Sequence, residues 1–237
     1  MDIRENKEDI ENIENTYIVI FVGGKNKRMK RTAPYSSFND IKVSYPIELS
    51  SKEGIIPIFE KLIKDLEGIG GNIYLLSDNK EKKEKIGGYV KRKGIGAECT
   101  SKNIETKDRL LFFGEKKSII DKPVFLLIVA GDSIFEGKEN ISVNEEIKDF
   151  VEKAKELIEN KGTKVVWGVI PQENYKGGEE SLKNQTKCVV DENNRVISAR
   201  KNCEPKEGEK LFASLIFARA DIFFRLIKKA KDVHDIY

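Results

Sequence analysis

The chain has 237 residues, 39% of them hydrophobic, and its 43 lysine and arginine residues nearly balance 40 aspartate and glutamate residues, which leaves a net charge of +3. So small and dispersed a charge argues against a nucleic-acid-binding surface. No apolar run approaches the roughly 18 residues that a membrane span needs, so we expect neither nucleic acid nor membrane as a partner.

Residues 1–16 are charged and rich in asparagine, without the apolar core of a secretory signal. We therefore expect a polar tail over residues 1–16, a single domain over residues 17–237, and a cytoplasmic protein. Cys99, Cys188 and Cys203 are widely spaced and form no CxxC pair. Their spacing predicts plain thiols rather than disulfides or a zinc site.

An apolar run at residues 17–22 leads directly into a glycine-rich basic loop, which consists of Gly23, Gly24, Lys25, Asn26, Lys27, Arg28 and Met29. Two glycines let the backbone turn with its N–H groups exposed, and the basic side chains concentrate positive charge on the same loop. A first strand followed by such a loop is typical of the phosphate site of nucleotide-binding α/β domains. A basic connecting turn without a ligand is the alternative interpretation.

Residues 30–42 are predicted to form a polar loop beside that site. Residues 55–66 carry apolar side chains three and four apart, which predicts an amphipathic helix with Pro57 in its first turn. Residues 72–78 have the composition of a buried strand, and residues 79–93 are charged enough for a solvated helix.

Residues 94–120 show no clear pattern, and only residues 110–113 are apolar enough to be buried. The strongest predicted strand follows at residues 123–130 and ends at Gly131 and Asp132. Open α/β sheets bind their ligands at the carboxyl ends of the strands, so Asp132 is a candidate site residue. Its alternative role is to cap a turn.

The last third of the chain begins with a predicted helix at 145–160 and a strand at 164–170, with Trp167 in the core. Two short strands around a polar turn at 191–194 predict a hairpin. A further strand at 211–218 precedes a closing helix at 221–231, which Asp221 is expected to cap. Because strands and helices alternate in the first two thirds, we predict an α/β fold with a mostly parallel sheet flanked by helices.

This order of parts resembles the sugar-phosphate nucleotidylyltransferases, from about residue 17 to residue 224. The matching residues are Gly23, Gly24, Arg28 and Met29 of the family's GGxGxR loop and the Gly131-Asp132 pair. The resemblance implies a Rossmann-like core with a small antiparallel hairpin insertion. It also implies a reaction in which a nucleoside triphosphate and a sugar 1-phosphate are joined, with Mg²⁺ as cofactor and pyrophosphate as the second product.

The same resemblance implies roles for individual residues. Arg28 and the loop at 23–27 hold the triphosphate, and Lys42 is the nearest match to the catalytic lysine that follows this loop in the family. Asp132 binds the metal, and Asp235 is the candidate for the second metal carboxylate, with Asp232 as its neighbour. Tyr175 and Lys201 match the acceptor side, and an ordinary exposed lysine is the alternative for Lys201. His234, the only histidine, receives no catalytic role.

Four departures from the family pattern stand out. Asn26 replaces the third loop glycine, and Pro46 is followed directly by Ile47 where the family has a lysine. The base-contacting glycine-rich segment is not recognisable between residues 96 and 118, and residues 212–214 read Phe-Ala-Ser in place of Asn-Ala-Gly. Two other functions therefore remain open: a nucleotide- or sugar-nucleotide-binding regulatory module with weakened catalysis, and a nucleotidyltransferase for a non-sugar acceptor. A homo-oligomer is possible with each of them.

Overall fold

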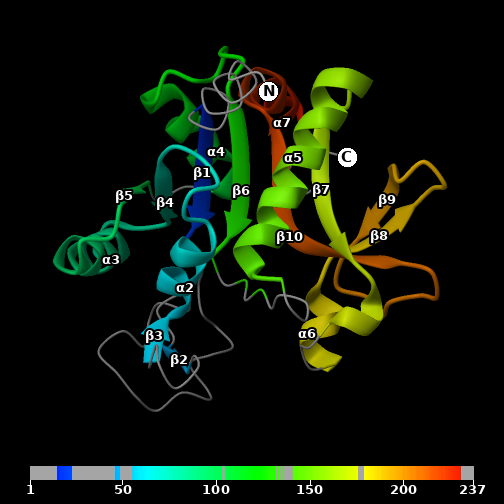
Figure 1. The fold of residues 1–237 in the computed structure, drawn as a ribbon, viewed down its shortest axis with the longest axis horizontal. Coiled ribbons are helices and arrows are strands. Elements are labelled where there is room, and N and C mark those ends of the chain that lie inside the picture. Colours follow the sequence, from blue (N-terminus) through cyan, green and yellow to red (C-terminus); the bar gives the residue numbers. More distant parts are fainter. Residues whose placement is uncertain are drawn as a thin grey trace, which may run out of the picture.

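The computed structural model describes residues 15–22, 46–48, 55–102, 105–131, 133, 135, 141–175 and 179–230. Four parallel strands form one half of its sheet in the order β5, β4, β1, β6, with β5 at the edge (Figure 1). Their bounds are β1 (Thr16–Phe21), β4 (Ile73–Ser77), β5 (Ala97–Ser101) and β6 (Phe125–Ala130). Three of these strands coincide with the apolar runs in the sequence, because a strand covered on both faces needs apolar side chains on both faces.

The sheet continues through antiparallel strands beyond β6. The long strand β10 (Lys210–Arg219) pairs with β6, with β7 (Val165–Ile170) and with β8 (Lys187–Val190), and β8 pairs in turn with β9 (Val196–Arg200). The predicted mostly parallel sheet and the antiparallel hairpin are thereby confirmed. A separate two-stranded ladder joins β2 (Pro46–Glu48) to β3 (Ile55–Pro57).

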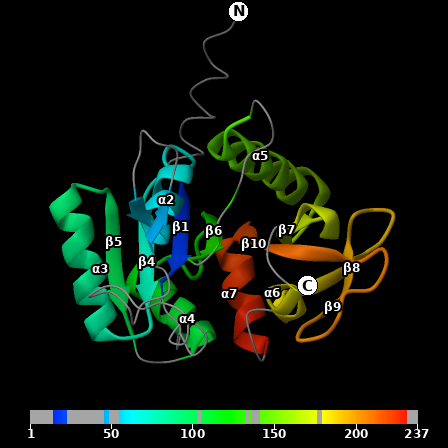
Figure 2. The same cartoon turned by 90° about the horizontal axis from the view of Figure 1, so that it is seen from below.

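Helices cover both faces of the sheet, as Figure 2 shows for α2 and α5 on one side and α4 and α7 on the other. One apolar cluster packs α2 (Ile58–Asp65), α3 (Lys80–Lys93) and α5 (Val143–Lys161) against one face. A second cluster packs α4 (Thr106–Lys116) and α7 (Ala220–Lys229) against the other. The short helices η3 (Gln172–Asn174) and α6 (Glu179–Asn184) lie between β7 and β8 in the chain.

Local sequence signals explain where two of the helices begin. Asn79 caps α3 by accepting a hydrogen bond from the backbone N–H of Lys82 at 2.8 Å. At α5, Ser142 and Glu145 form a reciprocal capping box. Both helices end at a glycine in the left-handed conformation, with φ of 66° at Gly94 and at Gly162.

Three predictions of local structure are wrong. The helix predicted from residue 55 begins at Ile58, because Ile56 precedes a proline and is therefore pushed into the extended region, where it pairs in β3. The unpatterned segment 94–120 contains both β5 and α4. Asp221 does not cap α7, because it lies inside the first turn, where its carboxylate accepts hydrogen bonds from Arg219 at 2.7 and 3.1 Å.

Close packing between α4 and α7 depends on a glycine. A Cβ atom at Gly114 would lie 2.5 Å from the ring of Phe224 and 2.9 Å from Ile120. Trp167 lies in the core as predicted, 9% exposed, and packs against Phe212 with ring centroids 4.9 Å apart. Cys99, Cys188 and Cys203 form no disulfide bond with one another.

Candidate active site

The carboxyl ends of the four parallel strands meet at one edge of the sheet, where backbone hydrogen bonds hold them in register. The N–H of Val22 donates to the carbonyl of Leu76 at 3.0 Å, which joins the ends of β1 and β4. The N–H of Gly131 donates to the carbonyl of Phe21 at 2.9 Å, which joins the ends of β1 and β6. The carboxyl ends of β1, β4 and β6 therefore lie side by side.

The order of the parallel strands reverses at one position within this edge. From β1 the chain moves outward to β4 and β5, and it then crosses back to place β6 on the other side of β1. The order of connections reverses between β1 and β6, and open α/β sheets bind ligands in the crevice at such a reversal. In the sequence, the basic glycine loop comes shortly after the end of β1, and Asp132 comes two residues after Ala130 of β6.

The exit from β6 is a hydrogen-bonded turn. Its register places Ala130 opposite Phe21, and the N–H of Ser133 donates back to the carbonyl of Ala130 at 3.1 Å. The residues on both sides of position 132 are thus tied to the strand end.

Most of the predicted site residues lie outside the described residues. This applies to the loop residues Gly23 to Lys27, to Arg28 and Lys42, and to the carboxylates Asp132 and Asp235, and their roles stay predictions. Among the residues that the structure does describe, no cluster of three or more histidine, cysteine, aspartate and glutamate side chains is arranged to hold a metal ion. No helix within the same described ranges is long and apolar enough to cross a membrane.

A polar cluster lies at the end of β4. Ser77 is fully buried, and the carboxylate of Asp78 accepts from the ammonium of Lys82 at 3.0 Å. Arg109 of α4 is 7% exposed, and burial lowers the pKa of its guanidinium against the opposing effects of Asp78 and Glu105. This cluster brings a charged residue of the segment 94–120, to which the sequence pattern gave no element, to the end of β4.

The antiparallel strands form the other side of the same edge. Leu215 of β10 pairs with Val129 near the end of β6, so the first residues of β10 continue past β6, and Leu211 pairs there with Ile170 at the end of β7. Figure 1 shows β6 and β7 pointing toward the same end of the molecule, with α6 at that end. The β8–β9 hairpin pairs with this overhanging part of β10.

Tyr175 and Lys201, the two predicted acceptor-side residues that the structure describes, both lie in this region. The hydroxyl of Tyr175 accepts a hydrogen bond from the side-chain amide of Gln185 at 3.3 Å. Lys201 is exposed and directly follows Arg200, the residue of β9 that pairs with Lys187. The fold therefore brings the two segments to one part of the molecule. The contacts of Tyr175 and Lys201 with a ligand stay predictions.

Lys187 is a buried lysine that the sequence pattern did not reveal. It is 0% exposed, and its ammonium donates to the carbonyls of Leu182, Lys183 and Gln185 at 2.6, 2.7 and 2.9 Å. These carbonyls belong to the end of α6 and the residue beyond it, where helical carbonyls lack partners within the helix. Lys187, the first residue of β8, therefore fixes the end of α6 to the β8–β9 hairpin.

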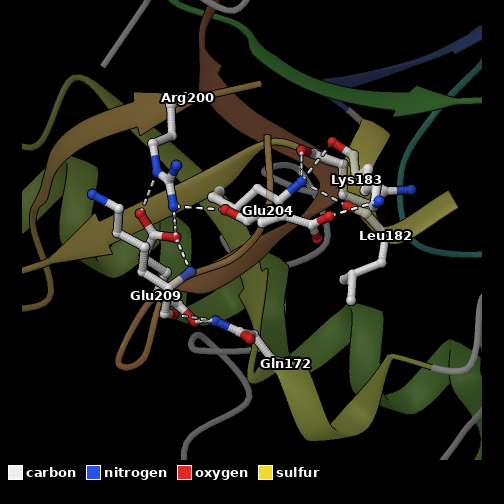
Figure 3. A network of polar contacts seen from close by, with 9 residues as sticks. Gln172, Leu182, Lys183, Arg200, Glu204 and Glu209 are labelled. Atoms are coloured by element: carbon white, nitrogen blue, oxygen red, sulfur yellow. Dashed lines mark hydrogen bonds and ion pairs between the residues drawn. The ribbon is translucent and has the colours of Figure 1, made fainter. Parts of the chain in front are cut away.

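A second network holds the loop between β9 and β10 (Figure 3). Arg200 binds both carboxylate oxygens of Glu209 at 2.6 and 2.5 Å and also donates to the carbonyl of Glu204 at 2.8 Å. Hydrogen bonds from Arg200 hold the pKa of Glu209 below its ordinary range. The amide of Gln172 donates to the carbonyls of Lys206 and Glu209 at 2.7 and 2.8 Å, which ties this loop to the segment after β7.

The backbone of β10 is irregular at Ser214. Ser214 has φ of 61°, and the register with β7 shifts between Phe212 and Ile216. A left-handed conformation disfavours residues with a Cβ atom and is common at functional sites. The position thus keeps the backbone geometry that favours glycine although serine occupies it.

No protein-family model and no curated protein matches the chain in sequence. Solved structures do match its fold. One is a Bacillus anthracis protein assigned as a glucose-1-phosphate thymidylyltransferase, in complex with sucrose, with a TM-score of 0.62 at 14% identity over 93% of this chain and 78% of that one. A second is the inositol-1-phosphate CTP transferase of T. maritima, with a TM-score of 0.60 at 13% identity over 91% and 74%.

A third similar structure is a CMP:2-keto-3-deoxy-manno-octonic acid synthetase complexed with CTP, with a TM-score of 0.57 at 12% identity over 90% of this chain and 77% of that chain. At such low identities the likeness shows the fold alone. It confirms the predicted fold class: an α/β sheet, mostly parallel and flanked by helices, of the type found in nucleotide-diphospho-sugar transferases.

Proposed function

We propose that this protein transfers a nucleotidyl group from a nucleoside triphosphate to the phosphate of a sugar 1-phosphate and releases pyrophosphate. The observation that carries the proposal is the adjacency of the β1 and β6 ends, with the Gly131 N–H bonded to the carbonyl of Phe21 at 2.9 Å. This adjacency starts the basic loop and Asp132 from the two sides of the reversal in strand order.

The reaction is an in-line attack of an acceptor phosphate oxygen on the α-phosphorus, with breakage of the bond to the departing pyrophosphate. Catalysis of such a transfer depends on positioning and on neutralising the charge of the phosphate oxygens. We assign Arg28, Lys25 and the backbone N–H groups of Gly23, Gly24, Asn26 and Lys27 to the triphosphate. Lys42 is the candidate for a second cation on the transferred phosphate.

Magnesium fits the proposed donors, because carboxylate and phosphate oxygens are the ligands it prefers, and it would supply charge neutralisation at the phosphates. Asp132 and Asp235 are the carboxylates that we assign to it. The course of α7 supports the second assignment, because Lys107, at the start of α4, donates to the carbonyl of Ala230 at the end of α7 at 2.5 Å. Since α4 follows β5, the chain leaves α7 near the ligand-binding edge.

Tyr175 and Lys201 are the proposed acceptor-side contacts. An exposed ammonium at Lys201 suits the phosphate of the acceptor. The networks centred on Lys187 and Glu209 hold α6 and the loop 201–209 and so give both residues a fixed base.

The test is a pyrophosphate-release assay with purified protein, a panel of nucleoside triphosphates and a panel of acceptor phosphates. We expect release to require one sugar 1-phosphate and Mg²⁺, and Asp132→Asn to abolish it. Asp121→Asn is the matched control, because this exposed aspartate precedes β6 at the opposite edge of the sheet and should retain full activity. A folded protein that releases no pyrophosphate with any combination would refute the proposal.

Two other functions remain as alternatives. A nucleotidyltransferase for a non-sugar acceptor, such as a polyol phosphate, has the support of the fold shared with the inositol-1-phosphate CTP transferase. Turnover with that acceptor class alone would select it. A binding module that regulates a partner is favoured by the departures at Asn26 and at residues 212–214, and calorimetric nucleotide binding without turnover would select that function.

A further inference from the structure

A single glutamine joins the two segments that carry the proposed acceptor-side residues. Gln172 lies in η3, just after β7, and its side-chain amide donates to the carbonyls of Lys206 and Glu209 at 2.7 and 2.8 Å. These carbonyls lie 34 and 37 residues later in the chain, in the loop between β9 and β10. Figure 3 shows Gln172 and Glu209 as members of one network of polar contacts.

The backbone of the same glutamine holds Tyr175. The N–H of Tyr175 donates to the carbonyl of Gln172 at 3.0 Å, and the N–H of Asn174 donates to the carbonyl of Pro171 at 3.2 Å. These two bonds close the single turn of η3, and Tyr175 is the residue at its end. Because Gln172 bonds the loop through its side chain and Tyr175 through its backbone, it fixes the two segments relative to each other.

The contact with Glu209 continues to Lys201. The side chain of Glu209 is 5% exposed, and its carboxylate accepts two hydrogen bonds from Arg200 at 2.6 and 2.5 Å. A bidentate pair of this kind fixes direction as well as distance. Lys201 directly follows Arg200 in the chain, and its own side chain is exposed. The backbone that carries the Lys201 ammonium is therefore held from behind, while the ammonium faces solvent.

A second path joins the same two segments. The hydroxyl of Tyr175 accepts a hydrogen bond from the side-chain amide of Gln185 at 3.3 Å, and the carbonyl of Gln185 accepts one from the ammonium of Lys187 at 2.9 Å. Lys187 pairs with Arg200 across the β8–β9 ladder. Tyr175 and Arg200 are thus connected twice, by a ring of contacts in which Gln172 supplies one side.

We propose that Gln172 is a positioning residue for the acceptor, which sets the place of Lys201 relative to Tyr175 through its contacts with the 201–209 loop. The proposal rests on the function proposed above, in which Tyr175 and Lys201 contact the acceptor. Gln172 touches no substrate in this scheme. Two groups bind one ligand well only when their spacing matches it, and a misplacement of about 1 Å caused by a distant change can cost about 100-fold in rate.

The first experiment measures the steady-state kinetics of pyrophosphate release, with the sugar 1-phosphate and the nucleoside triphosphate varied in turn. Gln172→Met keeps the length of the side chain and removes both donated hydrogen bonds, and Gln172→Glu keeps its shape and loses the donor. For both variants we expect the KM for the acceptor to rise about tenfold. The KM for the nucleotide and kcat should change by less than about twofold, because the contacts of Gln172 all lie in the acceptor-side segments.

Asn174→Ala is the matched control. This exposed residue belongs to the same short helix, and its bond to the carbonyl of Pro171 comes from its backbone N–H, which the substitution keeps. A double-mutant cycle then separates positioning from a general loss of stability. If Gln172 acts through Lys201, Gln172→Met should lower kcat/KM for the acceptor by less than about twofold further in a Lys201→Met background. Equal losses in the two backgrounds overturn the inference.

Hydrogen–deuterium exchange gives a readout that does not depend on activity. The N–H groups of Lys206 and Glu209 are hydrogen-bonded within the loop, and they should exchange faster in Gln172→Met than in the wild type or in Asn174→Ala. Unchanged exchange overturns the inference, as does an active Gln172→Met whose acceptor KM is that of the wild type. A folded wild type that releases no pyrophosphate refutes the proposed function, and the inference fails with it.

Discussion

Replacement of Lys187 by methionine tests whether a buried ammonium holds α6 to the hairpin. Methionine keeps the length and the apolar stem of the side chain and removes all three donated hydrogen bonds. The wild-type ammonium is 0% exposed and serves three carbonyls at 2.6, 2.7 and 2.9 Å. We expect Lys187→Met to unfold at markedly lower urea concentration than the wild type.

The size of the loss follows from two opposing costs. The carbonyl of Leu182 keeps the hydrogen bond from the N–H of Gln185 at 3.1 Å, so the substitution takes the donor from the carbonyls of Lys183 and Gln185. A buried carbonyl left without a donor costs about 1–3 kcal/mol. Burial also lowers the pKa of Lys187, so the wild-type ammonium itself carries a desolvation cost that offsets part of its hydrogen bonding. Since the end of α6 can regain water after the substitution, we set the expected decrease in the free energy of unfolding at ~3 kcal/mol, within the range that two carbonyls imply.

Trp167 provides the assay, because it is the only tryptophan, is buried, and packs against Phe212 of β10. With a urea dependence of about 2–3 kcal/mol/M, a 3 kcal/mol loss lowers the midpoint by roughly 1–1.5 M. Lys183→Met is the control, because its side chain is 53% exposed and its ion pair with Glu204 is worth only about 0–1 kcal/mol. A midpoint for Lys187→Met no lower than that of Lys183→Met would refute the reasoning.

Three further predictions concern stability. Gly114→Ala should lower the free energy of unfolding in urea by about 1–3 kcal/mol, because the new Cβ would overlap an aromatic ring. Gly88→Ala in α3 has room for a Cβ and should raise that free energy by up to about 1 kcal/mol. Equal effects of the two substitutions would contradict the packing argument. Ser214→Gly should gain about 0.5–1 kcal/mol, because it relieves a left-handed φ, and Ser198→Gly in β9 should instead lose stability. The lowered pKa of Glu209 means that its ionised form stabilises the fold above the ordinary carboxyl pKa and that this contribution is lost as the pH falls through the lowered value. The free energy of unfolding of Glu209→Gln should therefore depend less on pH below about pH 4 than that of the wild type. The same dependence on pH in both proteins would contradict a stabilising role of the ionised Glu209.

The strands at the centre of the sheet are predictable from the sequence because their environment dictates their composition. The strands β1, β4 and β6 are covered by helices on both faces, so nearly every residue must be apolar, and the runs at 17–22, 72–78 and 123–130 mark them directly. The edge strand β5 has only Thr100 fully buried. Without an apolar run it gives no such signal.

The candidate site likewise has features that local sequence patterns predict and contacts that they do not. A diglycine basic loop after a strand, and an aspartate after another strand, are local patterns that a sequence displays. The contacts that support the site join residues far apart in the chain, such as Gln172 with Lys206 and Glu209. No local pattern distinguishes Gln172 from an ordinary surface glutamine.

By itself, the sequence determined which segments form the buried strands β1, β4 and β6 and the alternation of strands and helices that gives the parallel part of the sheet, because these depend on local composition and spacing. Only the tertiary structure decided that β1 and β6 are neighbours at the reversal of strand order, that Lys187 is buried under α6, and that Gln172 reaches the loop between β9 and β10. Those features depend on hydrogen bonds and packing between segments that are far apart in the sequence. Such contacts form only in the folded chain, so no local sequence pattern indicates them.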